Sequence, residues 1–168
     1  DNRIDSAVLE PATVTIGKLL SGLRWSLDGR FVYALDTGWG AGRTSRIFNG
    51  PGAIHVISYG DGTRLRVIQS VPTGLSSESF TISPDGRLIA SVNMERTYLP
   101  SGFPTGIVSG RDASSVSLFS TDAASGRLTP LGEPVSFRGV LPQGIAFDRG
   151  GQNIAVAVFQ DHNADSTS

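Results

Sequence analysis

Three stretches of the chain share one pattern: an apolar segment, a short polar turn and a second apolar segment. They span residues 23–36, 80–93 and 145–159. In the middle copy the turn reads Pro84-Asp85-Gly86-Arg87. There proline presets a negative φ, aspartate can accept hydrogen bonds from its own backbone, and glycine adopts the positive φ that closes a hairpin. The pattern predicts three β-hairpins.

Further strand-like segments lie between the hairpins, as residues 53–59 with 64–68 and residues 115–120 with 127–131. The period is longer than that of the common helical solenoids and no amphipathic helical pattern is present, so we expect an all-β repeat protein. Four strands per period is the composition of a β-propeller blade. The expected divisions are an outer strand of a preceding blade in 1–20, a blade in 21–77, another in 78–142 and half of a further blade in 143–168.

The second strand of each hairpin is almost continuously apolar, whereas a strand wetted on one face would alternate. Inner propeller strands are buried between neighbouring blades, so this pattern favours a propeller. The outer strands should be more polar, and Arg64, Arg66, Arg127 and Thr129 agree with that. A β-sandwich is the alternative, because it is also built from hairpins.

Two connections, residues 37–52 and 94–112, are far longer than a hairpin requires. Strand direction reverses at each turn, so both should lie on one face, around the mouth of the central channel. Long loops on a rigid scaffold often carry binding or catalysis. The alternative is that they clasp a partner subunit or fill the channel.

About three blades do not make a closed ring, because closed propellers usually have at least four blades. An open sector would leave unpaired strand edges and an exposed inter-blade face. We therefore expect a complementary polypeptide that completes the propeller in a hetero-oligomer, either the rest of a nicked precursor or a partner subunit.

The 168 residues carry a formal net charge of -1, include no cysteine and contain no apolar run of bilayer length. Near-zero charge argues against a nucleic-acid partner, and the missing apolar run argues against membrane insertion. The chain begins with Asp1 rather than methionine, which suits a proteolytically processed, secreted or periplasmic product, an internal fragment or a trimmed chain.

The opening positions of the first strands are natural ligand contacts, since these strands line the channel. Aligning the hairpins places Ser21, Glu78 and Gln143 at equivalent positions. Glu78 could act as a general base, a metal ligand or a cation partner. The alternative is a channel carboxylate paired with an arginine or solvated by water.

The second strand of the middle hairpin should end at the same mouth with Asn93, and Glu95 and Arg96 follow shortly after it. With Glu78 they could form an oxygen-rich Ca²⁺ pocket, with Glu78 and Asn93 as ligands, or an arginine–carboxylate clamp for an acidic substrate. Glu78, Arg96 and His162 are the candidate catalytic residues. No ligand spacing here is diagnostic of a metal.

The two histidines differ in context. His55 lies mid-strand among apolar residues, which favours a structural role, whereas His162 lies in a polar stretch that could ligate metal, transfer protons or simply be solvated. Trp39 and Arg43 mix aromatic and basic groups, which suits either a small ligand or a subunit interface.

Several sequence motifs resemble those of the lactonase-like, YVTN-type (6-phosphogluconolactonase-type) seven-bladed propellers. They are Ser83-Pro84-Asp85-Gly86-Arg87-Leu88-Ile89-Ala90, Pro142-Gln143-Gly144-Ile145-Ala146-Phe147-Asp148, and Val116-Ser117-Leu118-Phe119 followed by Gly126-Arg127-Leu128. The resemblance covers most of residues 21–159 and implies a propeller fold. Where family enzymes often carry Pro-His, this chain has Pro142-Gln143. The resemblance therefore implies no catalytic histidine at this position.

Three functional hypotheses follow. In the first, the chain is a fragment or subunit of a lactonase-like propeller that binds a small polar ligand at the loop-rich face, as a hydrolase or isomerase. The second is a non-catalytic binding or assembly propeller. In the third, the chain is half of a proteolytically matured enzyme whose catalytic nucleophile lies on the following chain.

Overall fold

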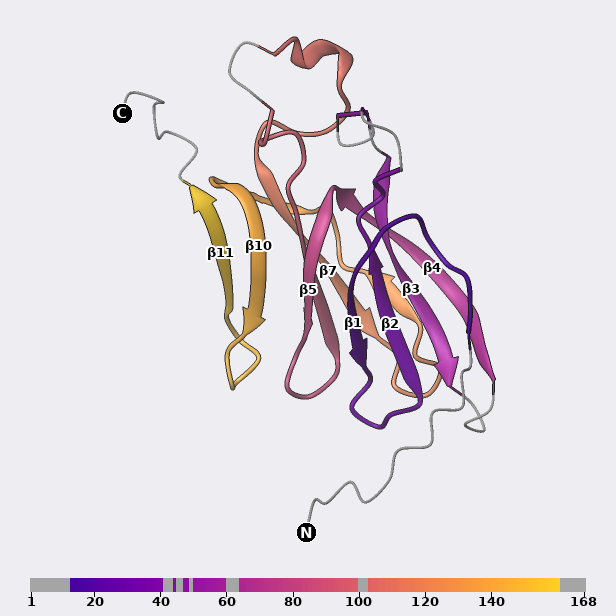
Figure 1. Ribbon diagram of the computed structural model, residues 1–168. Coiled ribbons are helices and arrows are strands. Elements are labelled where there is room, and N and C mark those ends of the chain that lie inside the picture. The colour runs from indigo at the N-terminus through magenta and orange to yellow at the C-terminus, as the bar shows by residue number, and fades with distance from the viewer. Residues whose placement is uncertain are drawn as a thin grey trace, which may run out of the picture.

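The computed structural model describes residues 13–40, 44, 47–48, 50–59, 64–99 and 103–160. Arg43 and His162 lie outside the described residues. The described chain is almost entirely β-structure, arranged as antiparallel sheets that stand side by side (Figure 1). One 3-10 turn, η1 (Thr105–Ile107), is the exception in this part of the chain. No helix among the described residues is both long and apolar enough to cross a bilayer.

The first sheet has four strands in the simple order β1-β2-β3-β4. The second repeats that order as β5-β6-β7-β8, with β9 pairing with part of β7, and β10 and β11 form a separate hairpin. The strands are β1 (Leu20–Trp25), β2 (Phe31–Asp36), β3 (Pro51–Tyr59), β4 (Leu65–Leu75), β5 (Ser77–Ile82), β6 (Leu88–Asn93), β7 (Ser114–Thr121), β8 (Leu128–Pro130), β9 (Val135–Phe137), β10 (Val140–Phe147) and β11 (Ile154–Gln160).

The hairpin turns form for the chemical reason that the sequence suggested. In the turn after β5, the Asp85 carboxylate accepts hydrogen bonds from the Ser83 hydroxyl (2.6 Å) and from the Arg87 backbone N–H (3.1 Å). Gly86 has a φ of 72°, a conformation that glycine adopts without a steric penalty. The turn after β1 repeats these contacts around Asp28, whose pKa is lowered to about 2 by hydrogen bonds from Ser26 and Arg30.

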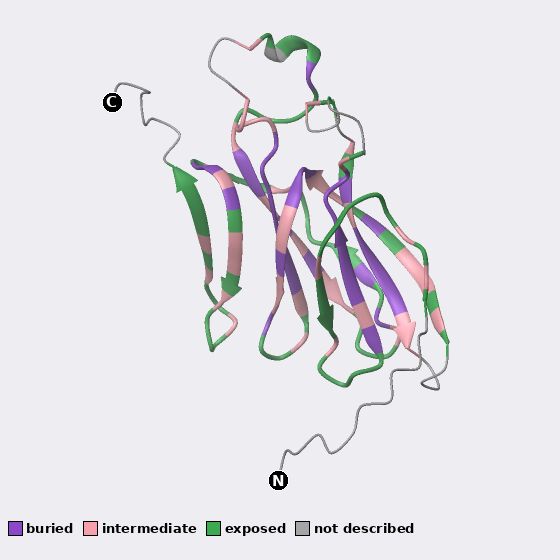
Figure 2. Ribbon diagram, in the orientation of Figure 1, coloured by how far each residue is buried: buried purple, intermediate pink, exposed green. Residues whose placement is uncertain are grey.

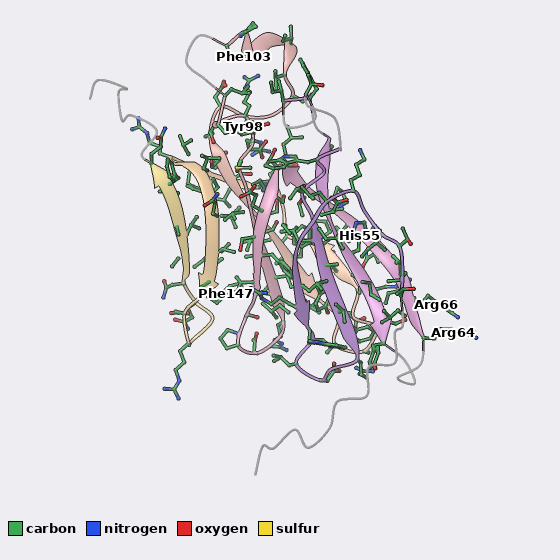
Figure 3. All side chains as sticks on the ribbon, viewed as in Figure 1. His55, Arg64, Arg66, Tyr98, Phe103 and Phe147 are labelled. Atoms are coloured by element: carbon green, nitrogen blue, oxygen red, sulfur yellow. The ribbon has the colours of Figure 1, made fainter. Side chains whose placement is uncertain are left out.

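The core lies between the first and second sheets (Figure 2). Tyr33, Leu35 and Ile54 from the first sheet pack against Phe80 and other apolar residues of the second, and all of these are nearly inaccessible to water. The outer strands are wetter: Arg64, Arg66, Arg127 and Thr129 are exposed, as the pattern predicted, and Figure 3 shows Arg64 and Arg66 at the rim of the first sheet. These sheets stack as propeller blades.

Some elements differ from the sequence expectation. An outer strand was expected within residues 1–20, but residues 13–19 form no strand, and residues 1–12 lie outside the described residues. Strand β4 continues to Leu75, well past the expected end at Ile68, and a register shift near Val56 on β3 accommodates its length. The pattern also missed β9, since three residues are too few to show a period.

Candidate functional site

Each first strand begins with a β-bulge. The pairing of β1 with β2 skips Ser21, the pairing of β5 with β6 skips Glu78, and the pairing of β10 with β11 skips Gln143. Each is thus the extra residue on its strand, and the registers place all three at one equivalent position of the repeat. Bulges re-aim side chains and are frequent beside active sites.

The three bulges lie in a row, because the first strands are neighbours: β1 contacts β5, and β5 contacts β10 (Figure 1). Ser21 and Gln143 are exposed, and Glu78 is partly buried. Ser76 and Leu141, two residues before Glu78 and Gln143, have φ values of 54° and 53°. A positive φ is unusual for a residue with a side chain, so the backbone is constrained at this row. Ser21, Glu78 and Gln143 are called the bulge row below.

A glycine fixes each first strand against its neighbour. A Cβ built on Gly17 would lie 2.5 Å from Asp36 Oδ2, one on Gly74 would lie 2.6 Å from Asn93 Cγ, and one on Gly139 would lie 2.7 Å from Val158 Cγ1. These separations leave no room for a side chain. The same close approach therefore recurs in all three repeats, where the incoming segment meets the end of the second strand.

Asn93 is the centre of a buried polar network. Its Oδ1 accepts hydrogen bonds from Ser77 Oγ (2.5 Å) and the Gly74 N–H (3.2 Å), and its Nδ2 donates to Ser115 Oγ (2.9 Å) and Ser117 Oγ (3.0 Å). Two donors and two acceptor positions are all that an amide offers. This geometry therefore gives Asn93 a structural role and leaves its oxygen no lone pair for Ca²⁺. No group of three or more histidine, aspartate or glutamate side chains suited to a metal occurs among the described residues.

Glu95 extends this network towards the loop face. It is only 4% exposed and has a φ of 56°. Its Oε1 accepts a hydrogen bond from Ser115 Oγ (2.8 Å), and its Oε2 accepts one from the Arg111 backbone N–H (3.3 Å). The Asn93–Ser115–Glu95 chain of hydrogen bonds links two of the residues that the sequence proposed as ligand contacts.

Arg96 braces the base of the 94–112 connection. Its Nε and Nη2 donate to the two carboxylate oxygens of Asp112 (2.7 and 2.9 Å), and its Nη1 donates to the Val108 carbonyl (3.1 Å). The hydrogen bonds to Asp112 raise the pKa of Arg96. The connection itself, which carries Tyr98 and Phe103, rises beyond the strand ends on the side where β1, β5 and β10 begin (Figure 3).

A cleft of about 570 Å³ opens between the first two blades at the loop face. On its rim, the Arg111 guanidinium donates to the Pro134 carbonyl (2.9 Å) and forms an ion pair with Glu133 (3.3 Å). Sequence reasoning nominated neither Arg111 nor Glu133, since they lie in unremarkable polar stretches. The cleft is lined by Gly50, Pro51, Thr73, Gly74, Leu75, Glu95, Ser109, Gly110, Arg111, Glu133 and Pro134.

Trp39 connects the first long loop to the segment that leads into β5. It is partly buried, and its indole Nε1 donates to the Ser76 hydroxyl (3.0 Å) at the start of the second blade. The roles expected for Arg43 and His162 stay predictions, because neither residue is among those described.

His55 is buried within the first sheet, as Figure 3 shows. Its Nδ1 lies 2.8 Å from Ser70 Oγ, and its Nε2 lies 3.8 Å from Asp36 Oδ2. Burial raises the pKa of Asp36, but hydrogen bonds from the backbone N–H groups of Gly38, Leu19 and Lys18 outweigh it and lower the pKa. This array anchors the segment that leads into β1.

Comparison with solved structures supports the propeller reading. A protein assigned as a 6-phosphogluconolactonase from Bacteroides fragilis matches with a TM-score of 0.61 and 22% identity, over 86% of this chain and 33% of that one. A similarly assigned protein from Bacteroides uniformis matches with a TM-score of 0.61 and 19% identity, over 93% and 39%. The periplasmic gluconolactonase of Pseudomonas aeruginosa matches with a TM-score of 0.56 and 26% identity, over 83% and 32%.

No family model and no curated protein matches the sequence. The chain spans about a third of the length of the solved structures it matches. Its successive antiparallel sheets and these neighbours agree on one architecture. The chain has the fold of a partial lactonase-like β-propeller.

Proposed function

We propose that this chain is part of a lactonase-like hydrolase that binds a small polar lactone at the bulge row. The proposal rests on the repeated bulge. In each of three adjacent first strands the bulge sets one extra residue out of the regular pairing, and these residues are Ser21, Glu78 and Gln143. Ser21 and Gln143 supply neutral hydrogen-bonding groups, and Glu78 supplies the carboxylate. The likeness to a periplasmic gluconolactonase supports a sugar lactone as substrate.

In this proposal Glu78 is the general base. Its carboxylate takes a proton from water as the water oxygen bonds to the lactone carbonyl carbon. The ring C–O bond then breaks, and the alkoxide that leaves takes the proton back from Glu78, which gives the open-chain hydroxy acid.

Hydrolysis of gluconolactone by the assembled protein tests this role. Glu78→Gln should lower kcat by about a hundredfold or more, because a positioned general base contributes at least that much. Glu133→Gln is the matched control, since its carboxylate is on the surface and away from the row. Equal activity in the two variants would refute the role of Glu78, and wild-type protein that binds gluconolactone without hydrolysing it would favour the non-catalytic binding propeller.

We further propose that a complementary polypeptide carrying additional blades covers both flanks of this sector. Trp25 on the outer face of the first blade is 53% exposed, and Phe159 on β11 is 72% exposed. Among the described residues, no strand pairs with the outer edge of β11. Since the matched structures are about three times as long, further blades are the fitting occupant.

Native mass spectrometry of the protein tests this partnership. A second polypeptide, or blades on a continuous longer chain, should be found with residues 1–168, and Trp25→Ser with Phe159→Ser should weaken their association. A lone, cooperatively melting monomer that consists of residues 1–168 alone would refute it. We also propose a secreted or periplasmic location, supported by the periplasmic neighbour; fractionation of the source cells would decide it.

A further inference from the structure

Glu95 is a buried carboxylate with no cationic partner among the described residues. Its two hydrogen bonds come from a serine hydroxyl and a backbone N–H, both neutral donors. The nearby guanidinium groups are engaged elsewhere, Arg96 with Asp112 and Arg111 with Glu133. A buried charge is costly unless it is paired, so this carboxylate is poised to accept a cation.

The cleft reaches this carboxylate between two glycines. A Cβ on Gly74 would lie 2.7 Å from Glu95 Oε1, and one on Gly110 would lie 3.5 Å from Glu95 Oε2. Both glycines line the cleft together with Glu95, and neither position has room for a side chain, because their backbones pack closely against Glu95 and Leu75. An ionised carboxylate has about four acceptor positions, of which two are used here.

The charge of the cleft favours a cation. Its ionisable lining residues are Glu95, Glu133 and Arg111, which together carry one net negative charge. One buried carboxylate is a poor site for a metal ion, which prefers several oxygen ligands. It suits an ammonium or guanidinium group, whose N–H donors can bond both free acceptor positions. The volume of about 570 Å³ lies within the usual range for small-molecule pockets.

We propose that the cleft between the first two blades binds an organic cation, with its ammonium or guanidinium head bonded to Glu95 in the cleft wall. This site is separate from the bulge row and does not depend on lactone hydrolysis. The positive φ of Glu95 fits this role, because strained residues persist where the surroundings hold a functional geometry.

Calorimetric titration of the assembled protein with agmatine and with n-butylamine tests the proposal, with n-butanol as the uncharged probe. Both cations should bind, and the alcohol should not. Glu95→Gln should weaken cation binding by about tenfold or more, since hydrogen bonds to a charged group contribute strongly. Glu133→Gln should weaken it less, because the Glu133 side chain is 91% exposed and screened by solvent. Failure of the cations to bind, or undiminished binding by Glu95→Gln, would overturn the site.

A pair of glycine variants keeps the test decisive if Glu95→Gln fails to fold. A Cβ on Gly50, in the cleft wall, or on Gly106, outside the cleft, would meet no atom within 4 Å. Gly50→Arg should weaken agmatine binding by about tenfold through charge repulsion, and Gly106→Arg, which adds the same charge elsewhere, should not. Equal affinities of the two variants would count against the cleft.

Discussion

Replacing Asn93 by alanine tests whether the buried polar network holds the second blade together. Asn93 is completely buried at the end of β6, and its side chain makes four hydrogen bonds, to the end of β4, the start of β5 and two serines of β7. A hydrogen bond contributes about 0.5–1.5 kcal/mol net, and a donor or acceptor left unpaired in the interior costs more. Since the four bonds share one side chain and are not additive, we expect Asn93→Ala to destabilise the protein by about 3–4 kcal/mol.

Urea denaturation followed by tryptophan fluorescence measures this loss. Gln69→Ala is the matched control, because Gln69 is partly buried and makes two hydrogen bonds, both with the backbone of Leu128. Gln69→Ala should lower the free energy of unfolding by about half as much as Asn93→Ala, because it removes two hydrogen bonds instead of four. The reasoning fails if Asn93→Ala costs less than about 1 kcal/mol, the value of one ordinary hydrogen bond.

Three further results are expected. Folding lowers the pKa of Asp28 to about 2. This carboxylate therefore stabilises the folded state above pH 3.8, and the contribution is lost as the pH falls through about 2. An NMR titration should show that Ser26→Ala moves the pKa of Asp28 upward, because the variant removes the hydrogen bond from the Ser26 hydroxyl. Phe80→Ala should cost about 3–5 kcal/mol in thermal unfolding, whereas exposed Phe48→Ala should cost almost nothing. Arg96→Lys loses the two-point bond to Asp112, so hydrogen exchange across residues 94–112 should accelerate.

The sequence predicted the parts of the fold that depend on local chemistry. The hairpin turn at Asp85-Gly86 is fixed by contacts within five residues. Continuous apolar runs also marked β2 and β6, which are almost wholly buried, whereas β11 has the same pattern but is mostly exposed, because no described strand lies beyond it. Aligning the turns also placed Ser21, Glu78 and Gln143 at equivalent positions, since each strand keeps a constant distance from its turn. The bulge itself was not predictable, because it depends on pairing with the next strand.

The cleft could not be predicted, because its parts meet only through tertiary packing. Glu95 is joined to Arg111 across a long loop, and Arg111 is joined to Glu133 across a whole strand pair. Asn93 illustrates the same limit: the sequence predicted that it ends a strand, as it does, but its four partners come from three other segments. A polar residue at a strand end gives no sign of whether it faces a ligand or a network.

The close packing of Gly17, Gly74 and Gly139 has a consequence for reading other chains. Each stands three positions before the residue that precedes a bulge, so the spacing from glycine to bulge is the same in every repeat. A methyl group there would collide with the second strand and push the incoming segment away from it. The bulge cannot be read from a sequence but the hairpin turn can, and each glycine stands nine residues before the start of its turn (17 to 26, 74 to 83 and 139 to 148), so this glycine-to-turn interval could mark blades in an unfamiliar sequence.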